Sequence, residues 1–364
     1  MQYRSGLSDR VKKQHMETLA AYREETLRPH PELRTLFLEM TCRCNEHCRH
    51  CGSGCGDFSE ENPLTAAEIH DLLVTVREDF TKLPHLAVTG GEPLLRRDFF
   101  AIMEDAAGLG FSWGMTSNGT LIDGETAHHL ATAGMRTISI SVDGLKEYHD
   151  WFRQSPGAFD RTMAGIRALV EEPGLDHVQI TTVVTHRNYA SLADIYELVR
   201  ATGVKSWRVI NMEPIGRARQ QQELLLTKEE YRGLFHFIRE HRYPKDGPEV
   251  LYGCSHYLGV KQEREVRPWY FLCNAGVYTA SVCYNGEVTA CLDIERRPEI
   301  MQGNIRTERF SSLWKNGFSI YRTDWRKTGP CATCPDYRFC AGDSFHTWDF
   351  DNMRPNLCMK GILF

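Results

Sequence analysis

The sequence predicts an α/β protein built on a parallel sheet, followed by a smaller cysteine-rich domain. Strand-like and helix-like segments alternate six times between residues 34 and 241. The thirteen cysteines fall into two groups, at 42–55 and 254–358, with none between them. Alternation of this kind implies parallel strands covered by helices, in a sheet that either curls into a barrel or stays open and doubly wound.

Each repeat spans about 25 to 35 residues, the length of a strand and its crossover helix. The first helix candidate begins at Thr65 with Glu68 three residues on, as in a capping box. In both architectures, catalytic groups collect at the carboxyl ends of the strands. Strands are expected at 34–40, 85–91, 111–119, 136–144, 177–185 and 206–216, and helices at 65–80, 98–110, 124–134, 158–172, 189–203 and 227–241.

The composition is that of a globular protein, with 41% apolar and 25% charged residues among 364. The net charge of −5 gives no general attraction to nucleic acid or to membranes. No apolar run approaches the roughly eighteen residues of a membrane span, and the charged N-terminal residues lack the apolar core of a signal peptide. We therefore expect a cytoplasmic protein, in which clustered cysteines indicate metal or cofactor ligation rather than disulfides.

Five cysteines lie within fourteen residues, in the loop after the first strand. Cys44, Cys48 and Cys51 have the spacing C-x3-C-x2-C. Three thiolates on one loop can bind three irons of a [4Fe–4S] cluster and leave the fourth iron open, and an open metal position is typical of a catalytic site. Zinc is the main alternative, but zinc loops usually pair two C-x2-C half-sites. Cys42 and Cys55 fit no such register and are expected to be buried or spectator thiols.

At this point the chain resembles the radical S-adenosylmethionine (radical SAM) superfamily. The match consists of CNEHCRHC (44–51) directly after the first strand and GGEP (90–93) at the end of the second, with His50 where the family usually has an aromatic residue. The resemblance implies a partial (β/α)6 TIM-type barrel over residues 34–241. It also implies that SAM chelates the open iron of the catalytic cluster, and that its cleavage yields a 5′-deoxyadenosyl radical that takes a hydrogen atom from the substrate.

Other residues at strand ends acquire roles through the same resemblance. Arg153 and Arg217 are candidate contacts to SAM or to the substrate. Without the resemblance, each glycine or serine could belong to an ordinary strand-end turn. The residues expected to contact SAM are Gly90, Gly91, Glu92, Pro93, Ser117, Asn118, Ser141 and Asp143.

The C-terminal cysteines follow a second recognisable layout. Cys273 and Cys291 fit C-x12-G-x4-C, and the later run fits C-x2-C-x5-C before a last cysteine. This layout resembles the SPASM domain, an auxiliary iron–sulfur extension of radical SAM enzymes that modify peptides and proteins. The resemblance implies an inner auxiliary cluster on Cys273 and Cys291, with Cys283 or Cys254 as a third ligand. It implies an outer [4Fe–4S] cluster on Cys331, Cys334, Cys340 and Cys358.

The inner auxiliary cluster departs from the family pattern. Four residues after Cys340, where the family usually has another cysteine, this chain has Ser344. The inner cluster would then have an open iron, or use Cys254, Asp343, Ser344 or His346, or be a [2Fe–2S] centre. Zinc held by thiolates is the structural alternative for the whole domain. The sequence thus predicts one or two auxiliary clusters.

Changes in residue composition along the sequence divide the chain into four parts. Residues 1–33 are expected to be a helical lead-in, 34–241 the barrel, 242–253 a linker, and 254–364 a small cysteine-rich α+β domain that binds the auxiliary clusters. Only about 33 residues precede the first strand, too few for a winged-helix module that binds a leader peptide. Leader recognition is therefore expected to need a separate protein or another surface.

The leading functional prediction is the modification of a ribosomally made peptide, by a thioether or C–C crosslink or by oxidation. The alternatives are protein oxidation of the anaerobic sulfatase-maturase type, dehydrogenation of a small molecule, and a non-enzymatic iron–sulfur electron carrier. Asp293 lies two residues past Cys291, one residue away from the position of a catalytic aspartate in sulfatase maturases, so that role is not transferred. The expected partners are a peptide or protein substrate and a reductant such as flavodoxin or ferredoxin.

Overall fold

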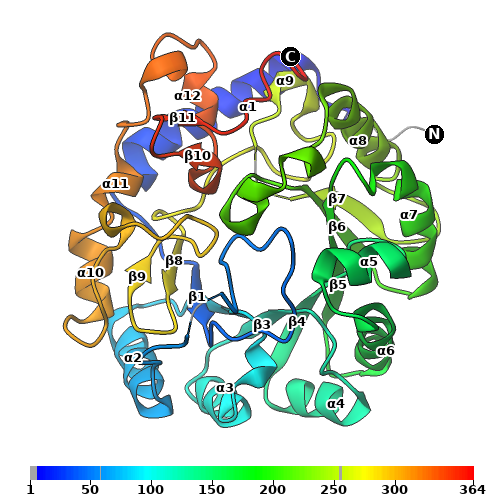
Figure 1. Cartoon of the computed structure of the whole chain (residues 1–364). Helices are drawn as coiled ribbons and strands as arrows, with labels where there is room; N and C mark the ends of the chain where they lie inside the picture. The colour runs from blue at the N-terminus through cyan, green and yellow to red at the C-terminus, as the bar shows by residue number, and fades with distance from the viewer. Residues whose placement is uncertain (1–5, 58, 254–255) are drawn as a thin grey trace.

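The computed structural model describes residues 6–57, 59–253 and 256–364. Within these residues, nine strands form one sheet in the order β7-β6-β5-β4-β3-β2-β1-β8-β9. The sheet curls around a central axis and carries helices on its outer side (Figure 1). The strands are β1 (Thr35–Glu39), β2 (His85–Thr89), β3 (Trp113–Ser117), β4 (Met135–Ser141), β5 (His177–Val184), β6 (Ser206–Asn211), β7 (Glu249–Tyr252), β8 (Thr279–Val282) and β9 (Val288–Thr289).

Strands β1 to β7 pair in parallel with their neighbours in sequence. A helix follows each of the first six strands and returns the chain to the start of the next, which confirms the predicted α/β class. Thr65 and Thr227 cap α2 and α8 through complete capping boxes. The covering helices are α2 (Ala66–Asp79), α3 (Phe99–Gly108), α4 (Gly124–Thr132), α5 (Lys146–Arg153), α6 (Ala158–Glu171), α7 (Leu192–Ala201) and α8 (Lys228–Glu240).

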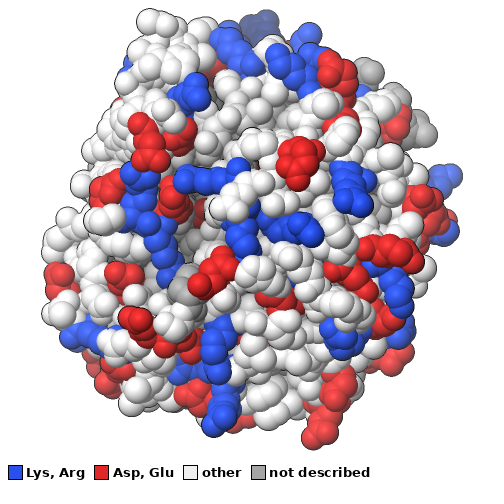
Figure 2. Space-filling view, in the orientation of Figure 1, with Lys and Arg blue, Asp and Glu red and all other residues white. Residues whose placement is uncertain are grey.

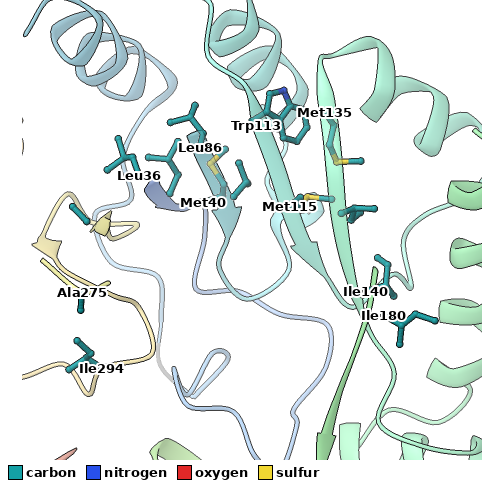
Figure 3. Close-up of a cluster of buried hydrophobic side chains, with 14 of the residues drawn as sticks. Leu36, Met40, Leu86, Trp113, Met115, Met135, Ile140, Ile180, Ala275 and Ile294 are labelled. Atoms are coloured by element: carbon teal, nitrogen blue, oxygen red, sulfur yellow. The ribbon is translucent and has the colours of Figure 1, made fainter. Parts of the chain in front are cut away.

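The main core lies between the strands and these helices. Alternate strand residues point outward and are apolar, which is why each strand presents one face to the helices. Burying each such side chain contributes about 1.5–3 kcal/mol. Fully buried examples drawn in Figure 3 are Leu36, Leu86, Trp113, Ile140 and Ile180. The opposite, inward-facing residues are mostly small and polar, so the centre of the barrel is lined by groups that can bind a polar ligand.

Both edges of the barrel sheet are extended by later segments. β8 pairs in parallel with β1, in the register Thr35↔Thr279, and β9 continues the sheet as an antiparallel neighbour of β8. β7, which pairs with β6, lies within residues 242–253, where the sequence indicated a linker. The cysteine-rich region therefore shares the sheet of the barrel, while the division into four sequence ranges stays a prediction.

The N-terminal helix α1 (Asp9–Tyr22) packs on the C-terminal region (Figure 1). Met16 is buried in a cluster with Tyr257, Phe271 and Phe339. Arg23 follows the helix and donates to the carbonyls of residues 338 and 339 at 2.8 and 3.2 Å. The C-terminal elements are short: α9 (Gly259–Gln262), α10 (Phe310–Asn316), α11 (Ser319–Arg322), α12 (Tyr337–Cys340), β10 (Trp348–Asp349) and β11 (Arg354–Pro355).

The face that looks into the barrel carries no large patch of one charge sign. Figure 2 shows basic and acidic side chains interspersed over the face that looks into the barrel. Among the described residues, no helix combines the length and the apolar character needed to cross a membrane. The surface observed in Figure 2 agrees with the mild net charge of −5.

Candidate active site

The loop between β1 and α2 carries the cysteine triplet and crosses the centre of the barrel in the view of Figure 1. The three thiols of the triplet influence one another electrostatically. Burial raises the pKa of Cys44 to about 11 and also raises the pKa of Cys48, and the neighbouring Cys51 adds to both shifts. The structure therefore brings together the three residues that the motif predicts as ligands.

The two other cysteines of this loop occupy different positions. The Cys55 thiol donates a hydrogen bond to the sulfur of Cys51, which lowers the pKa of the Cys51 thiol. Cys42 is buried, and the carboxylates that act on its thiol are Glu60 and Glu39. Cys55 thus contacts a predicted cluster ligand, whereas Cys42 lies at the start of the loop, where its carbonyl accepts a hydrogen bond from Gly56 N at 3.1 Å.

The GGEP segment at the end of β2 fits directly under the cysteine loop. Gly91 N donates to the carbonyl of Thr41 at 2.8 Å, and Glu92 N donates to that of Arg43 at 2.9 Å. A Cβ on Gly91 would overlap the Arg43 carbonyl, and Gly90 has a φ of +148° and would overlap Thr41. The two glycines are therefore required because two backbone segments approach closely here.

The buried carboxylate of Glu92 accepts hydrogen bonds from two of the other predicted strand-end residues. Its two oxygens accept hydrogen bonds from the Ser117 hydroxyl at 3.0 Å and from Asn118 N at 2.9 Å. Burial raises the pKa of Glu92 to about 7. The Asn118 side chain in turn donates to Asn45 in the cysteine loop at 2.7 Å. Glu92 thus connects the ends of β2 and β3 to each other and, through Asn118, to the cysteine loop. Pro93 follows it and is buried.

A buried charge network lies on the other side of the cysteine loop. Nε of Arg153 donates to Asp143 at 2.6 Å, and its Nη1 lies 3.4 Å from Glu46 and 3.6 Å from the sulfur of Cys48. Burial of Asp143 opposes ionisation, but Arg153, the neighbouring His50 and His149 and the hydrogen bond from Val183 N together lower the pKa of the carboxyl. Arg153 therefore brings a positive charge next to a predicted cluster thiolate. Ser141 is the half-buried last residue of β4, two residues before Asp143.

His50 fills the position where the family usually has an aromatic side chain. Its ring stacks on Phe152, with centroids 4.4 Å apart and planes within 8°. Burial lowers the pKa of His50 to about 4, so the imidazole is neutral at pH 7. A neutral flat ring can stack as a phenyl ring does, which explains how histidine is accommodated here.

Arg217 secures the cysteine loop from the segment after β6. It donates to the carbonyls of Cys48 at 2.8 Å and Cys55 at 3.1 Å, and pairs with Asp57 at 2.8 Å. Gly216 before it has a φ of +53°, and a Cβ there would overlap the Cys51 carbonyl. Arg217 is thus bound to the loop backbone itself, a contact that the sequence did not reveal.

A [4Fe–4S] cluster suits the donor set of the triplet. Among the described residues, no three His, Cys, Asp or Glu side chains converge on a point where a single metal ion would bind. In a cubane each thiolate binds a different iron, so its ligands do not need to share one centre. Glu46 Oε1 is also buried here without a hydrogen-bond partner among the described residues. Cys44, Cys48 and Cys51 would hold the cluster and leave its fourth iron open to SAM.

The outer cysteines of the C-terminal region line one cavity of about 260 Å³. Lys360 Nζ lies 3.6 Å from the sulfur of Cys334, and apolar side chains, among them Tyr257 and Met359, close the cavity walls. Four thiols around one cavity suit a fully ligated [4Fe–4S] cluster. The four are Cys331, Cys334, Cys340 and Cys358.

The cysteines expected for the inner cluster are not gathered in the same way. Cys273 lines a separate cavity of about 20 Å³, which Cys291 does not line. Cys291 is half-buried with its sulfur 4.0 Å from Asp293. Cys283 is buried after β8, where the charged groups that act on its thiol are Glu39, Arg296 and Glu287. Cys254 lies outside the described residues.

Sequence reasoning did not find the buried group formed by His256, Glu213 and Asp343. The two ring nitrogens of His256 lie 2.6 Å from Glu213 and 2.7 Å from Asp343. Burial alone would lower the pKa of His256, but the two carboxylates raise it to about 10. The sequence indicates Asp343 only as an alternative cluster ligand, and no local motif connects residues so far apart in sequence. The other alternative ligands, Ser344 and His346, lie on the next short turn.

Two family patterns match the chain. The radical SAM superfamily matches residues 38–199, and an iron–sulfur cluster-binding domain, SPASM, matches residues 273–335. An AdoMet-dependent heme synthase from Oleidesulfovibrio alaskensis is 30% identical over 328 residues, which make up 86% of this chain and 82% of that protein. The chain belongs to the radical SAM superfamily.

This radical SAM enzyme is also similar to proteins that are named for other activities. An Fe-coproporphyrin III synthase from Methanosarcina barkeri is 29% identical and covers 76% of this chain and 72% of its own length. The mycofactocin maturase MftC from Mycobacterium tuberculosis is 26% identical, with corresponding shares of 84% and 77%. SuiB from Streptococcus suis, solved with S-adenosylmethionine, has a TM-score of 0.69 at 14% identity and covers 94% of this chain and 80% of its own. The likeness to SuiB confirms the partial barrel with its C-terminal extension.

Membership of the superfamily settles the cofactors in general terms. The radical SAM and SPASM domains bring S-adenosylmethionine and iron–sulfur clusters with them. The same membership identifies the chain as an enzyme and disfavours the non-enzymatic electron carrier. The individual ligands and SAM contacts remain predictions that the geometry above supports.

Proposed function

We propose that this radical SAM enzyme removes a hydrogen atom from a carboxylate-bearing substrate held inside the barrel, and that the substrate is a tetrapyrrole. The observation that carries the proposal is Arg208, a cationic side chain on the inner face of β6. Three similar proteins, all AdoMet-dependent heme synthases, support the tetrapyrrole as the substrate class.

The position of Arg208 follows from its neighbours in the strand. Trp207 and Val209 are fully buried on the helix side, where Trp207 contacts Tyr196 of α7. Arg208 must therefore point to the opposite, inner face. Its Nε donates to the Thr181 hydroxyl at 3.1 Å, and among the described residues no carboxylate pairs with it.

The surroundings of Arg208 are polar and uncharged. The hydroxyls of Thr181 in β5 and Ser139 in β4 share a hydrogen bond of 2.7 Å. The two hydroxyl groups lie side by side on the inner face, next to Arg208. A guanidinium in such a position can bind a substrate carboxylate through two parallel hydrogen bonds. This arrangement would hold an acidic substrate in the barrel, below the cysteine loop.

Some residues of the chain would position the cysteine loop, and Arg208 would orient the substrate. When bound, the catalytic cluster and SAM supply the 5′-deoxyadenosyl radical that abstracts the hydrogen atom. Gly90 and Gly91 leave room for the cysteine loop, and Glu92 and Arg153 hold that loop from either side. Arg208 then fixes the substrate so that one C–H bond faces the radical, since orientation decides which hydrogen is taken.

The test uses Fe-coproporphyrin III as the probe, with anaerobically reconstituted enzyme, SAM and dithionite. The expected result is 5′-deoxyadenosine together with conversion of the porphyrin to heme, measured by mass spectrometry. In that conversion each of two propionates loses a hydrogen atom to the radical, its carboxylate as carbon dioxide, and one electron to an oxidised iron–sulfur cluster, and becomes a vinyl group. Arg208→Gln should raise KM at least about tenfold, because a charged hydrogen bond contributes about 1.5–3 kcal/mol, whereas Arg208→Lys should retain part of the affinity. A porphyrin that remains unchanged while 5′-deoxyadenosine accumulates would rule out this substrate.

Peptide modification is the second candidate, and it is the function that the sequence predicts first. The specific observation in its favour is the similarity to the mycofactocin maturase MftC over 84% of this chain. Coexpression with a short precursor peptide encoded nearby should then give a peptide that has lost a pair of hydrogens for each crosslink or oxidation. A separate leader-binding protein and a flavodoxin or ferredoxin would be the partners of that reaction.

A further inference from the structure

The cysteine-rich region contains two cavities that differ greatly in size. The outer cavity, lined by four cysteines, has a volume of about 260 Å³. The inner cavity, lined by Cys273 and Cys340, has a volume of about 20 Å³. A space of the second size holds about one water molecule, and a cluster of four irons and four sulfides does not fit in it.

The side chain of Arg326 lines the inner cavity. Its Nη1 donates to the carbonyls of Gly342 and Asp343 at 3.2 and 2.9 Å. Its Cζ lies 3.7 Å from the centroid of the Phe345 ring. Arg326 is only 3% exposed. Hydrogen bonds on one side and an aromatic ring on another fix this side chain, so it cannot move aside without losing both.

The inner cavity also carries several positively charged side chains, which a site for an iron–sulfur cluster does not need. Arg23 and Arg28 line it together with Arg326. Arg28 pairs with Asp324 at 2.7 Å, but among the described residues no carboxylate pairs with Arg326. The Cys273 and Cys340 thiols are within electrostatic range of Arg326. A buried guanidinium beside two thiols supplies the positive charge that cluster irons would otherwise supply.

The ligands expected for an inner cluster also do not line one common cavity. Cys283 lies after β8, against Glu39 and Arg296, and Cys291 does not line the inner cavity. Ser344 stands where the family pattern has a cysteine. Two expected ligands, Cys283 and Cys291, thus lie outside the lining of the inner cavity, and serine replaces a third.

We propose that Arg326 takes the place of the inner auxiliary cluster, so that this enzyme carries one auxiliary cluster, at the outer cysteines. Cys273 is then a free thiol within range of a guanidinium, and the segment that carries Cys340 is held by the hydrogen bonds of Arg326. The proposal concerns the metal content of the protein and does not depend on which substrate it takes.

Iron and sulfide counting after anaerobic reconstitution and desalting tests the proposal. The wild-type chain should hold about eight irons and eight sulfides, the content of two [4Fe–4S] clusters. Cys273→Ala/Cys291→Ala should keep about eight irons. The matched variant Cys334→Ala/Cys358→Ala should fall to about four. About ten or twelve irons in the wild type, or a loss of iron in the first variant, would overturn the proposal.

A spectroscopic count avoids any dependence on the folding of those variants. Replacing Cys44, Cys48 and Cys51 by alanine removes the catalytic cluster and leaves the cysteine-rich region intact. After reduction, the EPR signal of this variant should integrate to about one spin per chain. Two spins per chain, or two interacting signals, would show that the inner position holds a second auxiliary cluster.

Discussion

Nε2 of His256 lies 2.6 Å from Oε1 of Glu213 in an ion pair that is closed off from solvent. Its other ring nitrogen pairs with Asp343 at 2.7 Å. Glu213 follows β6 of the barrel, and Asp343 lies three residues after Cys340 of the outer cavity. One buried imidazolium therefore joins the carboxyl end of the barrel to the segment that would bind an auxiliary cluster.

Removal of this imidazolium should destabilise the fold strongly. His256→Ala leaves Glu213 and Asp343 buried without a cation, and breaking a buried pair in this way costs about 3–5 kcal/mol. The free energy of unfolding, measured in urea, should fall by that amount. The control His236→Ala removes a histidine that pairs with Glu240 on the surface, and its effect should stay below about 1 kcal/mol. Equal effects of the two variants would contradict the role of His256.

Gly91 should not tolerate a side chain. The Cβ of Gly91→Ala would overlap the Arg43 carbonyl and approach Cys44, so the cysteine loop must shift at a cost of about 1–3 kcal/mol. We expect lower iron retention on desalting and a lower melting temperature. Gly108→Ala is the matched control, because it lies in α3 with open space around it. That change should stabilise the protein by about 0.5–1 kcal/mol.

Stability should depend on pH through Glu92. Burial raises its pKa from 4.5 to about 7, so its contribution to stability is fully present below pH 4.5 and is lost as the pH rises through 7. Relative to Glu92→Gln, the wild type should lose up to about 1.4 kcal/mol per pH unit between pH 5.5 and 7, and nothing further above that. Urea unfolding of both proteins at pH 5.5, 6.5, 7.5 and 8.5 measures the difference. A difference that is constant across this range would contradict the assignment.

The charge of Arg153 should set the reduction potential of the catalytic cluster. Its guanidinium lies 3.6 Å from the sulfur of Cys48, and a nearby cation favours the reduced cluster, which carries more negative charge. Arg153→Gln should therefore lower the potential in an EPR-monitored titration. It should also cost about 3–5 kcal/mol of stability, because Asp143 and Glu46 lose their partner. Arg153→Lys keeps the charge and should keep most of the potential; a potential unaffected by Arg153→Gln would exclude the electrostatic role.

The sequence predicted the barrel units well because their signals are local. Each strand, such as 177–185 for β5, has several apolar residues on one face, and each helix has its own periodicity. It missed α5, which is short and carries mostly polar residues between Lys146 and Arg153. It also gave no indication that β8 pairs with β1, because a register between residues so far apart has no local signature.

The same distinction applies to the candidate site. The triplet and GGEP are contiguous motifs, so their residues could be named before the structure was known. Arg217 and His256 act through contacts with partners more than forty residues away, and Arg326 is defined by the cavity that it fills. Only the folded chain brings such residues together.

The parallel pairing of β8 with β1 has a consequence for biosynthesis. The hydrogen-bonding edge of β1 stays exposed until residues about 240 positions later leave the ribosome. At about 5–20 residues per second this interval lasts roughly 10 to 50 s. During that time the nascent chain presents an uncovered strand to its surroundings, so chaperone binding should be strongest before Thr279 emerges.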